Sequence, residues 1–150
     1  MNSLNKTFLP IKDSHNRTWY LIDCTNQSLG RLATTVTCLL KGKLKCQYHP
    51  AIDIGDYVIL INANNVLINK MSKQYLVNNP GRPGHSLKIV NTSECLAQLA
   101  IKRAVKRMLT ETESKNIMKR LKIYNNQEHK HQAQNPIEIK LGTVYASIKQ

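Results

Sequence analysis

The stretch WYLIDCTNQSLGRLATTVTCLLKGK, residues 19–43, predicts a strand followed by a helix. It opens with a short apolar run that ends at Asp23, as a buried strand does. Apolar residues then recur at helical spacing on one face, at Leu29, Leu32, Ala33, Val36, Leu39 and Leu40. The stretch GDYVILINA, residues 55–63, contains a continuous apolar run, whereas a strand half exposed to water would alternate. Together they predict a βαβ unit and an α/β fold with a parallel sheet.

The ends of the first helix carry recognisable signals. A side-chain oxygen of Asn26 or Ser28 can accept hydrogen bonds from the first-turn amides. Gly42 lies where a left-handed C-terminal cap is expected. Lys41, Lys43 and Lys45 cluster after this helix. The negative end of the helix dipole favours lysines there, so part of the cluster is open to a structural explanation.

The rest of the chain predicts further elements of one domain. Residues 66–68 and the stretch QYLVN favour a strand or hairpin, and residues 78–88 favour a loop rich in turn-formers. Thr92 or Ser93 is expected to cap a second helix, whose apolar face holds Ala97, Ile101, Ala104, Val105 and Met108. A third, shorter helix is expected over residues 114–121, with Ile117, Met118 and Leu121 inward and Lys115, Lys119 and Arg120 outward. We expect an extended arm over residues 1–18, a core over 19–136 and a C-terminal tail over 137–150.

The charge of the chain indicates an anionic partner. Lys and Arg number 22 against 9 Asp and Glu, which gives a net charge of +13. An excess of this size attracts a polyanion, with nucleic acid as the first candidate and an anionic membrane surface as the second. No apolar run approaches the roughly 20 residues that span a bilayer. In the second helix, Lys102 and Lys106, and Arg103 and Arg107, are neighbours at i, i+4, which costs stability unless phosphates face them.

Metal and catalytic sites are weakly supported. The four cysteines form no C-x-x-C pair, so we expect reduced thiols. His129 and His131 form an H-x-H motif, but Glu128 is the only nearby acid and a zinc site needs three or four ligands. No G-x-S-x-G, H-E-x-x-H or P-loop occurs. The alternative is an enzyme acting on nucleic acid, with both histidines in a concave pocket at the carboxyl edge of the sheet.

Five segments, in order, resemble the large-subunit ribosomal protein L13 (uL13) family of the bacterial and organellar type. They are WYLIDCTNQSLGRLAT, LLKGKLKCQYHPAIDIGDYVILINA, the loop around GRPG, AIKRAVKRML and MKRLKIYNNQEHKHQAQNP. The resemblance covers residues 19–136. It implies a three-layer α/β/α domain around a mostly parallel four-stranded sheet. It also implies a structural constituent of the large ribosomal subunit that binds 23S-type rRNA early in assembly, touches neighbouring ribosomal proteins, has no catalytic activity and uses no cofactor or metal.

The resemblance also implies which residues face the RNA. They come from the first helix and the loop after it, the GRPG loop, the basic helices and the H-x-H segment: Arg31, Lys41, Lys43, Lys45, Tyr48, His49, Arg82, His85, Lys88, Lys102, Arg103, Lys106, Arg107, Lys119, Arg120, Lys122, His129, Lys130 and His131. From the loop alone, a plain surface turn at GRPG is almost as well supported. A further role in binding an mRNA that mimics the rRNA site is compatible with this reading.

The composition favours a plastid ribosome as the location. Lys outnumbers Arg by 16 to 6, and Asn and Ile are abundant, as in proteins encoded by A+T-rich plastid genomes. The N-terminus lacks an apolar signal core and is short for a transit peptide. A bacterial cytoplasm is the alternative location.

Overall fold

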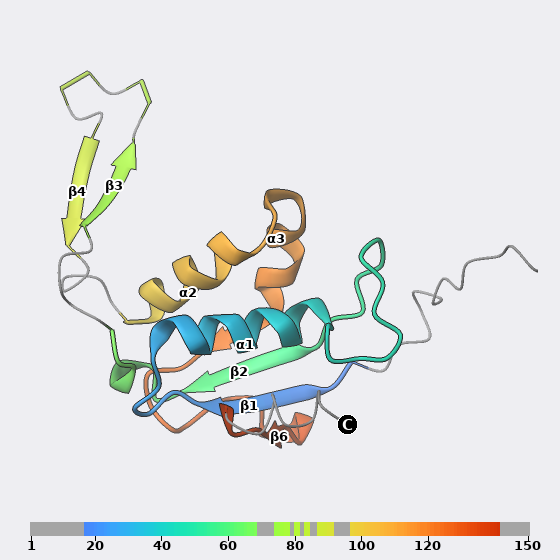
Figure 1. Ribbon diagram of the computed structural model, residues 1–150. Coiled ribbons are helices and arrows are strands. Elements are labelled where there is room, and N and C mark those ends of the chain that lie inside the picture. The colour runs from blue at the N-terminus through green and yellow to red at the C-terminus, as the bar shows by residue number, and fades with distance from the viewer. Residues whose placement is uncertain are drawn as a thin grey trace, which may run out of the picture.

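A four-stranded parallel sheet lies at the centre of the computed structural model, which describes residues 17–68, 74–78, 80–81, 83–84, 87–91 and 97–141 (Figure 1). The strand order is β5 (Leu121–Ile123), β2 (Tyr57–Ile61), β1 (Trp19–Asp23) and β6 (Ile137–Glu138), and every pair is parallel. The α/β class and the parallel four-stranded sheet are thereby confirmed.

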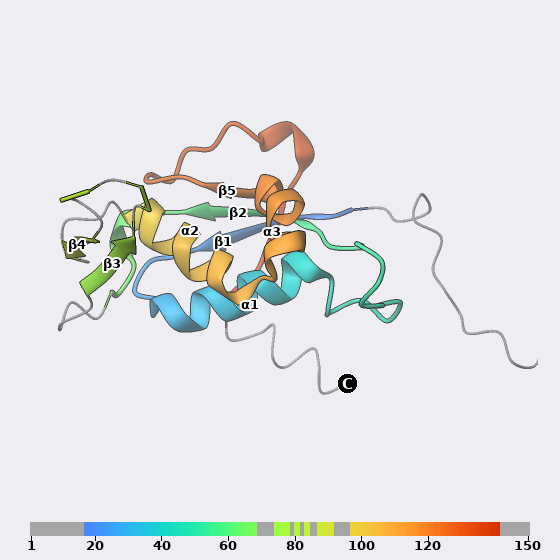
Figure 2. The same ribbon diagram turned by 90° about the horizontal axis from the view of Figure 1, so that it is seen from above.

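One face of the sheet is covered by helices (Figures 1 and 2). These are α1 (Leu29–Lys41), α2 (Ala97–Met108) and α3 (Glu111–Ile117). Alternate residues of the two central strands point to this side, where Ile22, Val58 and Leu60 join the main core. On α1 the predicted apolar face packs into the same core, with Leu32, Val36 and Leu40 fully buried.

The other face is covered by a different kind of layer. Leu21, Ile59 and Ile61 form a second cluster there, with Trp19 and Tyr124 packed against it. The covering chain is the segment 124–136, which contains the short 3-10 helix η6 (Gln132–Gln134) and runs from the β5 edge of the sheet to the start of β6 (Figure 1). Among the described residues, the α-helices therefore cover one face, and the outer layer on the other face is this segment with its short helix η6. The burial of β2 on both faces is confirmed.

Of the two predicted caps of α1, only the one at the C-terminal end is present. Gly42 has a φ of 73° in the left-handed region, and its amide donates to the carbonyls of Cys38 and Leu39. Ser28 is the N-cap residue, but its side chain makes no capping hydrogen bond. The amide of Leu29 instead donates to the carbonyl of Leu67, 3.2 Å away, so backbone from after the 3-10 helix η3 (Ala63–Asn65) satisfies the first turn.

The later elements differ from the expected boundaries. An antiparallel hairpin pairs β3 (Gln74–Asn78) with β4 (Leu87–Asn91). The loop expected over residues 78–88 therefore begins one residue later and ends two residues earlier than expected. Helix α3 begins at Glu111 and ends at Ile117, and the chain continues through η5 (Met118–Arg120) into β5. Met108 was expected on the buried face of α2 but is 43% exposed. The start of the expected tail pairs with β1 as β6. Three of the expected features lie outside the described residues: the arm up to residue 16, the helix caps Thr92 and Ser93, and the end of the tail, residues 142–150.

Candidate nucleic-acid interface

Helix α2 presents basic side chains to solvent along one side. Lys102, Lys106 and Arg107 are exposed and Arg103 is half-buried, while Ile101 and Val105 on the other side are fully buried. The separation follows from the helical repeat, since residues three and four apart share a face. The predicted row of like charges is therefore held outward by the apolar contacts of the opposite side.

A groove between α2 and α3 collects several of these cations. It has a volume of about 520 Å³, and its lining includes Leu99, Met118, Glu111 and the basic residues Lys102, Arg103, Lys106 and Lys115. A second hollow of about 530 Å³ shares Lys102, Lys115 and Met118. It continues along η5 and β5, which add Lys119 and Lys122 to the lining. We call this surface the basic groove: Lys102, Arg103, Lys106, Lys115, Lys119 and Lys122. Lys115 was missing from the expected site residues, although its place opposite the inward residues of the third helix would have indicated it.

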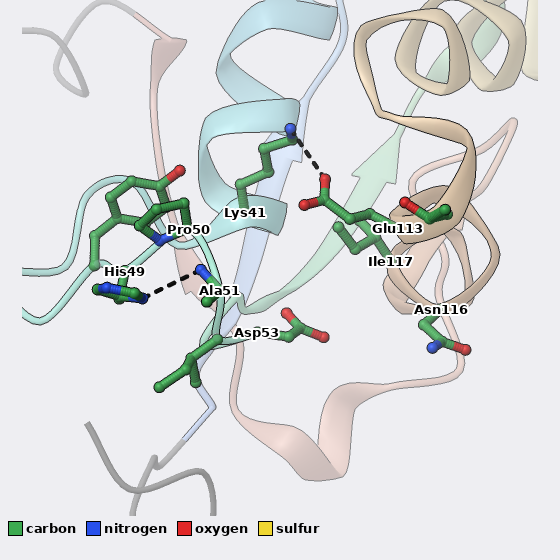
Figure 3. Close-up of a pocket in the computed structure, with 11 residues that line it drawn as sticks. Lys41, His49, Pro50, Ala51, Asp53, Glu113, Asn116 and Ile117 are labelled. Atoms are coloured by element: carbon green, nitrogen blue, oxygen red, sulfur yellow. Dashed lines mark hydrogen bonds and ion pairs between the residues drawn. The ribbon is translucent and has the colours of Figure 1, made fainter. Parts of the chain in front are cut away.

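A smaller hollow lies where α1 ends and α3 begins (Figure 3). Its volume is about 260 Å³, and the predicted residues Lys41, Tyr48 and His49 line it together with Asp53 and Asn116. Lys41 Nζ lies 3.2 Å from a carboxylate oxygen of Glu113, which also lines the hollow. Hydrogen bonds from the side chains of Thr110 and Lys41 hold the pKa of Glu113 below its ordinary value. The charge of Lys41 is thus partly balanced within the protein.

Two predicted cations are engaged inside the protein. Lys45 Nζ donates to Asp56 Oδ1 at 2.6 Å and to the carbonyl of Ile54 at 3.1 Å. Arg120 is 4% exposed, and its Nη1 and Nη2 each donate to one carboxylate oxygen of Asp53 at 2.7 Å. The expectation that Arg120 projects outward is wrong, because its position at the end of η5, just before β5, directs the guanidinium beneath the end of α1.

The Arg120 ion pair also determines the charge state of its partner. Burial raises the pKa of Asp53, but the hydrogen bonds and positive charge of Arg120 outweigh that effect and lower the pKa below its ordinary value. Asp53 is therefore a carboxylate at neutral pH, and the pair is a bidentate, charge-assisted contact.

The H-x-H segment lies on the sheet face opposite the helices. The ring of His131 is 5.1 Å from that of Trp19 and 6.1 Å from that of Tyr124, and the ring of His129 is 6.5 Å from that of Tyr124. Nδ1 of His129 accepts a hydrogen bond from the amide of His131 at 3.3 Å. Both histidines are half-buried packing groups in this structure, whereas Lys130 between them is exposed.

The remaining predicted residues are scattered. Arg31 is exposed in the first turn of α1 and Lys43 is exposed just after its last turn, so they lie about 20 Å apart along a 13-residue helix. Lys88 lies in β4, and its side chain is outside the described set. Arg82 and His85 also lie outside the described residues, beside Gly81 and Gly84, which have positive φ values.

None of the described helices is long and apolar enough to cross a bilayer. Within the same residues, no three His, Cys, Asp or Glu side chains gather in a way that could hold a metal ion.

Comparison with known proteins identifies relatives over nearly the whole chain. The family profile described as ribosomal protein L13 matches residues 17–130. A protein named large ribosomal subunit protein uL13c, from Trieres chinensis, is 45% identical over 137 residues, which are 91% of this chain and 97% of the relative.

Cyanobacterial proteins named large ribosomal subunit protein uL13 are also similar. The one from Synechococcus sp. (strain WH7803) is 38% identical over 92% of this chain and 95% of its own length. The one from Microchaete diplosiphon is 36% identical over 94% of this chain and 97% of its own length. The name uL13c of the Trieres chinensis protein denotes the chloroplast form, which agrees with the plastid location that the amino-acid composition favours. The chain therefore belongs to the ribosomal protein L13 family, and it is a structural constituent of the large ribosomal subunit in the plastid ribosome rather than an enzyme.

Proposed function

We propose that the protein binds 23S-type rRNA of the large subunit mainly through the basic groove and supports early assembly of that subunit. The observation that carries the proposal is the convergence of cations from four elements on one surface: α2, α3, η5 and β5. Among the described residues that line the two hollows, Glu111 is the only acid. Such a surface suits the phosphate backbone, which supplies most of the affinity in protein–RNA contacts of this kind.

The like-charged neighbours on α2 support the same proposal. Lys102 and Lys106 repel each other across one helical turn, at a cost of a few tenths of a kcal/mol. Phosphates bound along the groove would remove this repulsion and add binding free energy, because each neutralised phosphate releases counterions. The exposed side chains Leu99 and Met108, 44% and 43% exposed, flank the row and add apolar surface for sugars or bases.

The other predicted residues form secondary contacts in this proposal. Tyr48, His49 and Lys43 lie in the loop after α1, and Lys130 lies on the opposite side of the sheet. Contacts on both sides of the sheet would require the RNA, or several of its helices, to surround the domain. Lys41 and Lys45 contribute less to the attraction of phosphates, because Glu113 and Asp56 already form ion pairs with them.

The test is binding of an rRNA fragment by a groove variant. The double substitution Lys102→Gln and Lys106→Gln should weaken binding and reduce the slope of log affinity against log salt by about two contacts, roughly 0.7–0.9 each. Fluorescence anisotropy with a labelled large-subunit rRNA fragment, measured at several salt concentrations, gives both quantities.

The matched control is Lys140→Gln. Lys140 is exposed and follows β6, at the edge of the sheet opposite β5. Its removal takes one charge from the chain but none from the groove, so the affinity should change little. The proposal would be refuted if the loss of RNA affinity per removed charge were the same in the groove variant and in the control. That result would show that the net charge of the protein causes the binding and that no defined surface does.

A further inference from the structure

The segment 43–56, which we call the basic loop, joins the end of α1 to the start of β2. It contains no helix or strand and is long for a connection inside a compact domain. Loops of this kind serve binding when a rigid scaffold holds them. The first part of the loop carries the predicted RNA-facing residues Lys43, Tyr48 and His49, and Tyr48 is 39% exposed.

The second part of the loop is fixed against α1 and β1. A Cβ added at Gly55 would overlap the carbonyl oxygen of Leu40, so the two backbones are in close contact. The amide of Asp56 donates to the carbonyl of Leu39 at 3.2 Å. The carboxylate of Asp56 accepts from the amide of Thr18 at 2.9 Å and from Lys45 at 2.6 Å.

Arg120 adds the contact between this loop and a distant part of the chain. It is 67 residues from Asp53 in sequence, and its two terminal nitrogens bind both Asp53 oxygens. Its Nη2 also donates to the carbonyl of Leu40 at 3.1 Å. One guanidinium therefore joins three parts of the structure: η5, the basic loop and the last turn of α1.

We infer that Arg120 is a positioning residue, which holds the basic loop in its RNA-binding shape and does not contact RNA itself. The inference rests on the proposed function, since it explains how one part of that interface is held. A phosphate contact would require Arg120 to leave a 4% exposed site and two charge-assisted bonds, and would leave Asp53 without its cation. Asp53 lies four residues after His49, so the bond fixes the chain close to the residues that the loop presents.

The substitution Asp53→Asn separates the two roles. If Arg120 positions the loop, the neutral amide weakens the bond, the loop loosens, and RNA affinity falls several-fold although the protein has become more positive by one charge. If Arg120 binds phosphate directly, the same substitution frees the guanidinium and removes a negative charge, and RNA affinity stays the same or rises. The two roles thus predict changes of opposite direction.

Two measurements follow the variant. Amide hydrogen exchange of the free protein should show faster exchange in residues 43–56, with the sheet unchanged. RNA titrations at several salt concentrations should show weaker binding with an unchanged salt slope, because no phosphate contact is lost. Arg120→Lys should behave in the same way, since a lysine keeps the charge but cannot form the bidentate pair.

Glu138→Gln is the charge-matched control. It removes one exposed carboxylate from β6, at the edge of the sheet opposite β5, without touching the basic loop or the basic groove, and it should bind RNA as tightly as the unaltered protein. Asp53→Asn keeps an oxygen that accepts from Arg120, so it is the variant to use if Arg120→Lys fails to fold.

Two results would overturn the inference. One is RNA affinity of Asp53→Asn equal to or above that of the unaltered protein, with unchanged exchange in the basic loop. The other is a salt slope reduced by about one contact in Arg120→Gln, because only loss of the positive charge would remove a direct phosphate contact. Absence of salt-sensitive binding by the unaltered protein would instead refute the proposed function, and the exchange measurement would still test whether Arg120 orders the loop.

Discussion

At the scale of single residues, Gly55 is a position where the fold tolerates no side chain. Its Cα faces the Leu40 carbonyl so closely that an added methyl group would overlap backbone. Backbone cannot rotate away as a flexible side chain does, so α1 or the start of β2 would have to move. We predict that Gly55→Ala lowers the free energy of unfolding by about 2–3 kcal/mol, the upper range for overpacking, as measured by urea denaturation.

Gly30→Ala is the control for that measurement. Gly30 lies in the first turn of α1 and a Cβ there would meet nothing within 4 Å. Alanine favours a helix over glycine by up to about 1 kcal/mol, so this substitution should be neutral or stabilising. Equal urea midpoints for the two variants would show that the close approach at Gly55 is absent in solution.

The cysteines differ sharply in their expected reactivity. Burial, together with the charge of the neighbouring Asp23, raises the pKa of Cys24 to about 12, and this side chain is fully buried. Cys46 lies exposed in the basic loop. The thiolate is the reactive form, so we predict that iodoacetamide at neutral pH alkylates Cys46 in the native protein and Cys24 only after unfolding. Peptide mass spectrometry gives the site of labelling, and comparable native rates would contradict the burial.

Some of these residue roles could be predicted from the sequence and others could not. The left-handed cap at Gly42 was predictable because glycine after an apolar helical repeat is a local signal. The burial of Arg120 was not, because its reason is Asp53, 67 positions away. In sequence, Arg120 stands among Lys115, Lys119 and Lys122, and nothing local distinguishes the inward cation from the outward ones.

At the scale of elements, the helices were easier to predict than the edge strands. The apolar repeat of α1 spans three turns, and five of its six residues are buried, whereas Leu29 is only partly buried. The buried Thr35 and Thr37 lie outside the predicted repeat. Strands β5 and β6 have three and two residues, too few to show any periodicity, and their existence depends on pairing with β2 and β1. The basic groove was only partly predictable for the same reason, because β5 forms one of its sides.

The ion pair between η5 and the basic loop makes an element-scale prediction about acid. The pKa of Asp53 is lowered in the folded protein, so the stabilisation is fully present above the ordinary value of 3.8 and is lost as the pH falls through the folded value. We predict that Asp53→Asn is less stable than the unaltered protein at about pH 6, and that the difference shrinks towards about pH 3.

Urea denaturation at a series of pH values measures this difference. It should stay below the about 3–5 kcal/mol seen when fully buried pairs are broken, because the Asp53 side chain is 37% exposed. A difference that stays constant from about pH 6 to about pH 3 would show that the carboxylate charge contributes nothing to the attachment of the loop.

At the scale of the whole molecule, the charge of +13 acts on stability as well as on binding. As a ribosomal protein it has rRNA and other ribosomal proteins as partners, and in their absence its cations repel one another. Salt screens this repulsion, so we predict that the melting temperature rises when monovalent salt increases from about 0.05 M to about 0.5 M.

The control for salt is the groove variant Lys102→Gln and Lys106→Gln. Two charges fewer on α2 leave less repulsion to screen, so the melting temperature of the variant should rise less with salt. A fall in the melting temperature of the unaltered protein would show that ion pairs such as Lys45–Asp56 outweigh the repulsion.

The single tryptophan has a consequence for following the protein in solution. Trp19 stacks on Tyr57 at 4.3 Å, and His131 lies against it from the segment that covers the second face of the sheet. All indole emission therefore comes from one half-buried site. Detachment of the covering segment would admit water to that ring and shift its emission to longer wavelength. The intrinsic fluorescence of this protein thus reports whether the second face is covered, without any label, while the basic groove is studied on the other side.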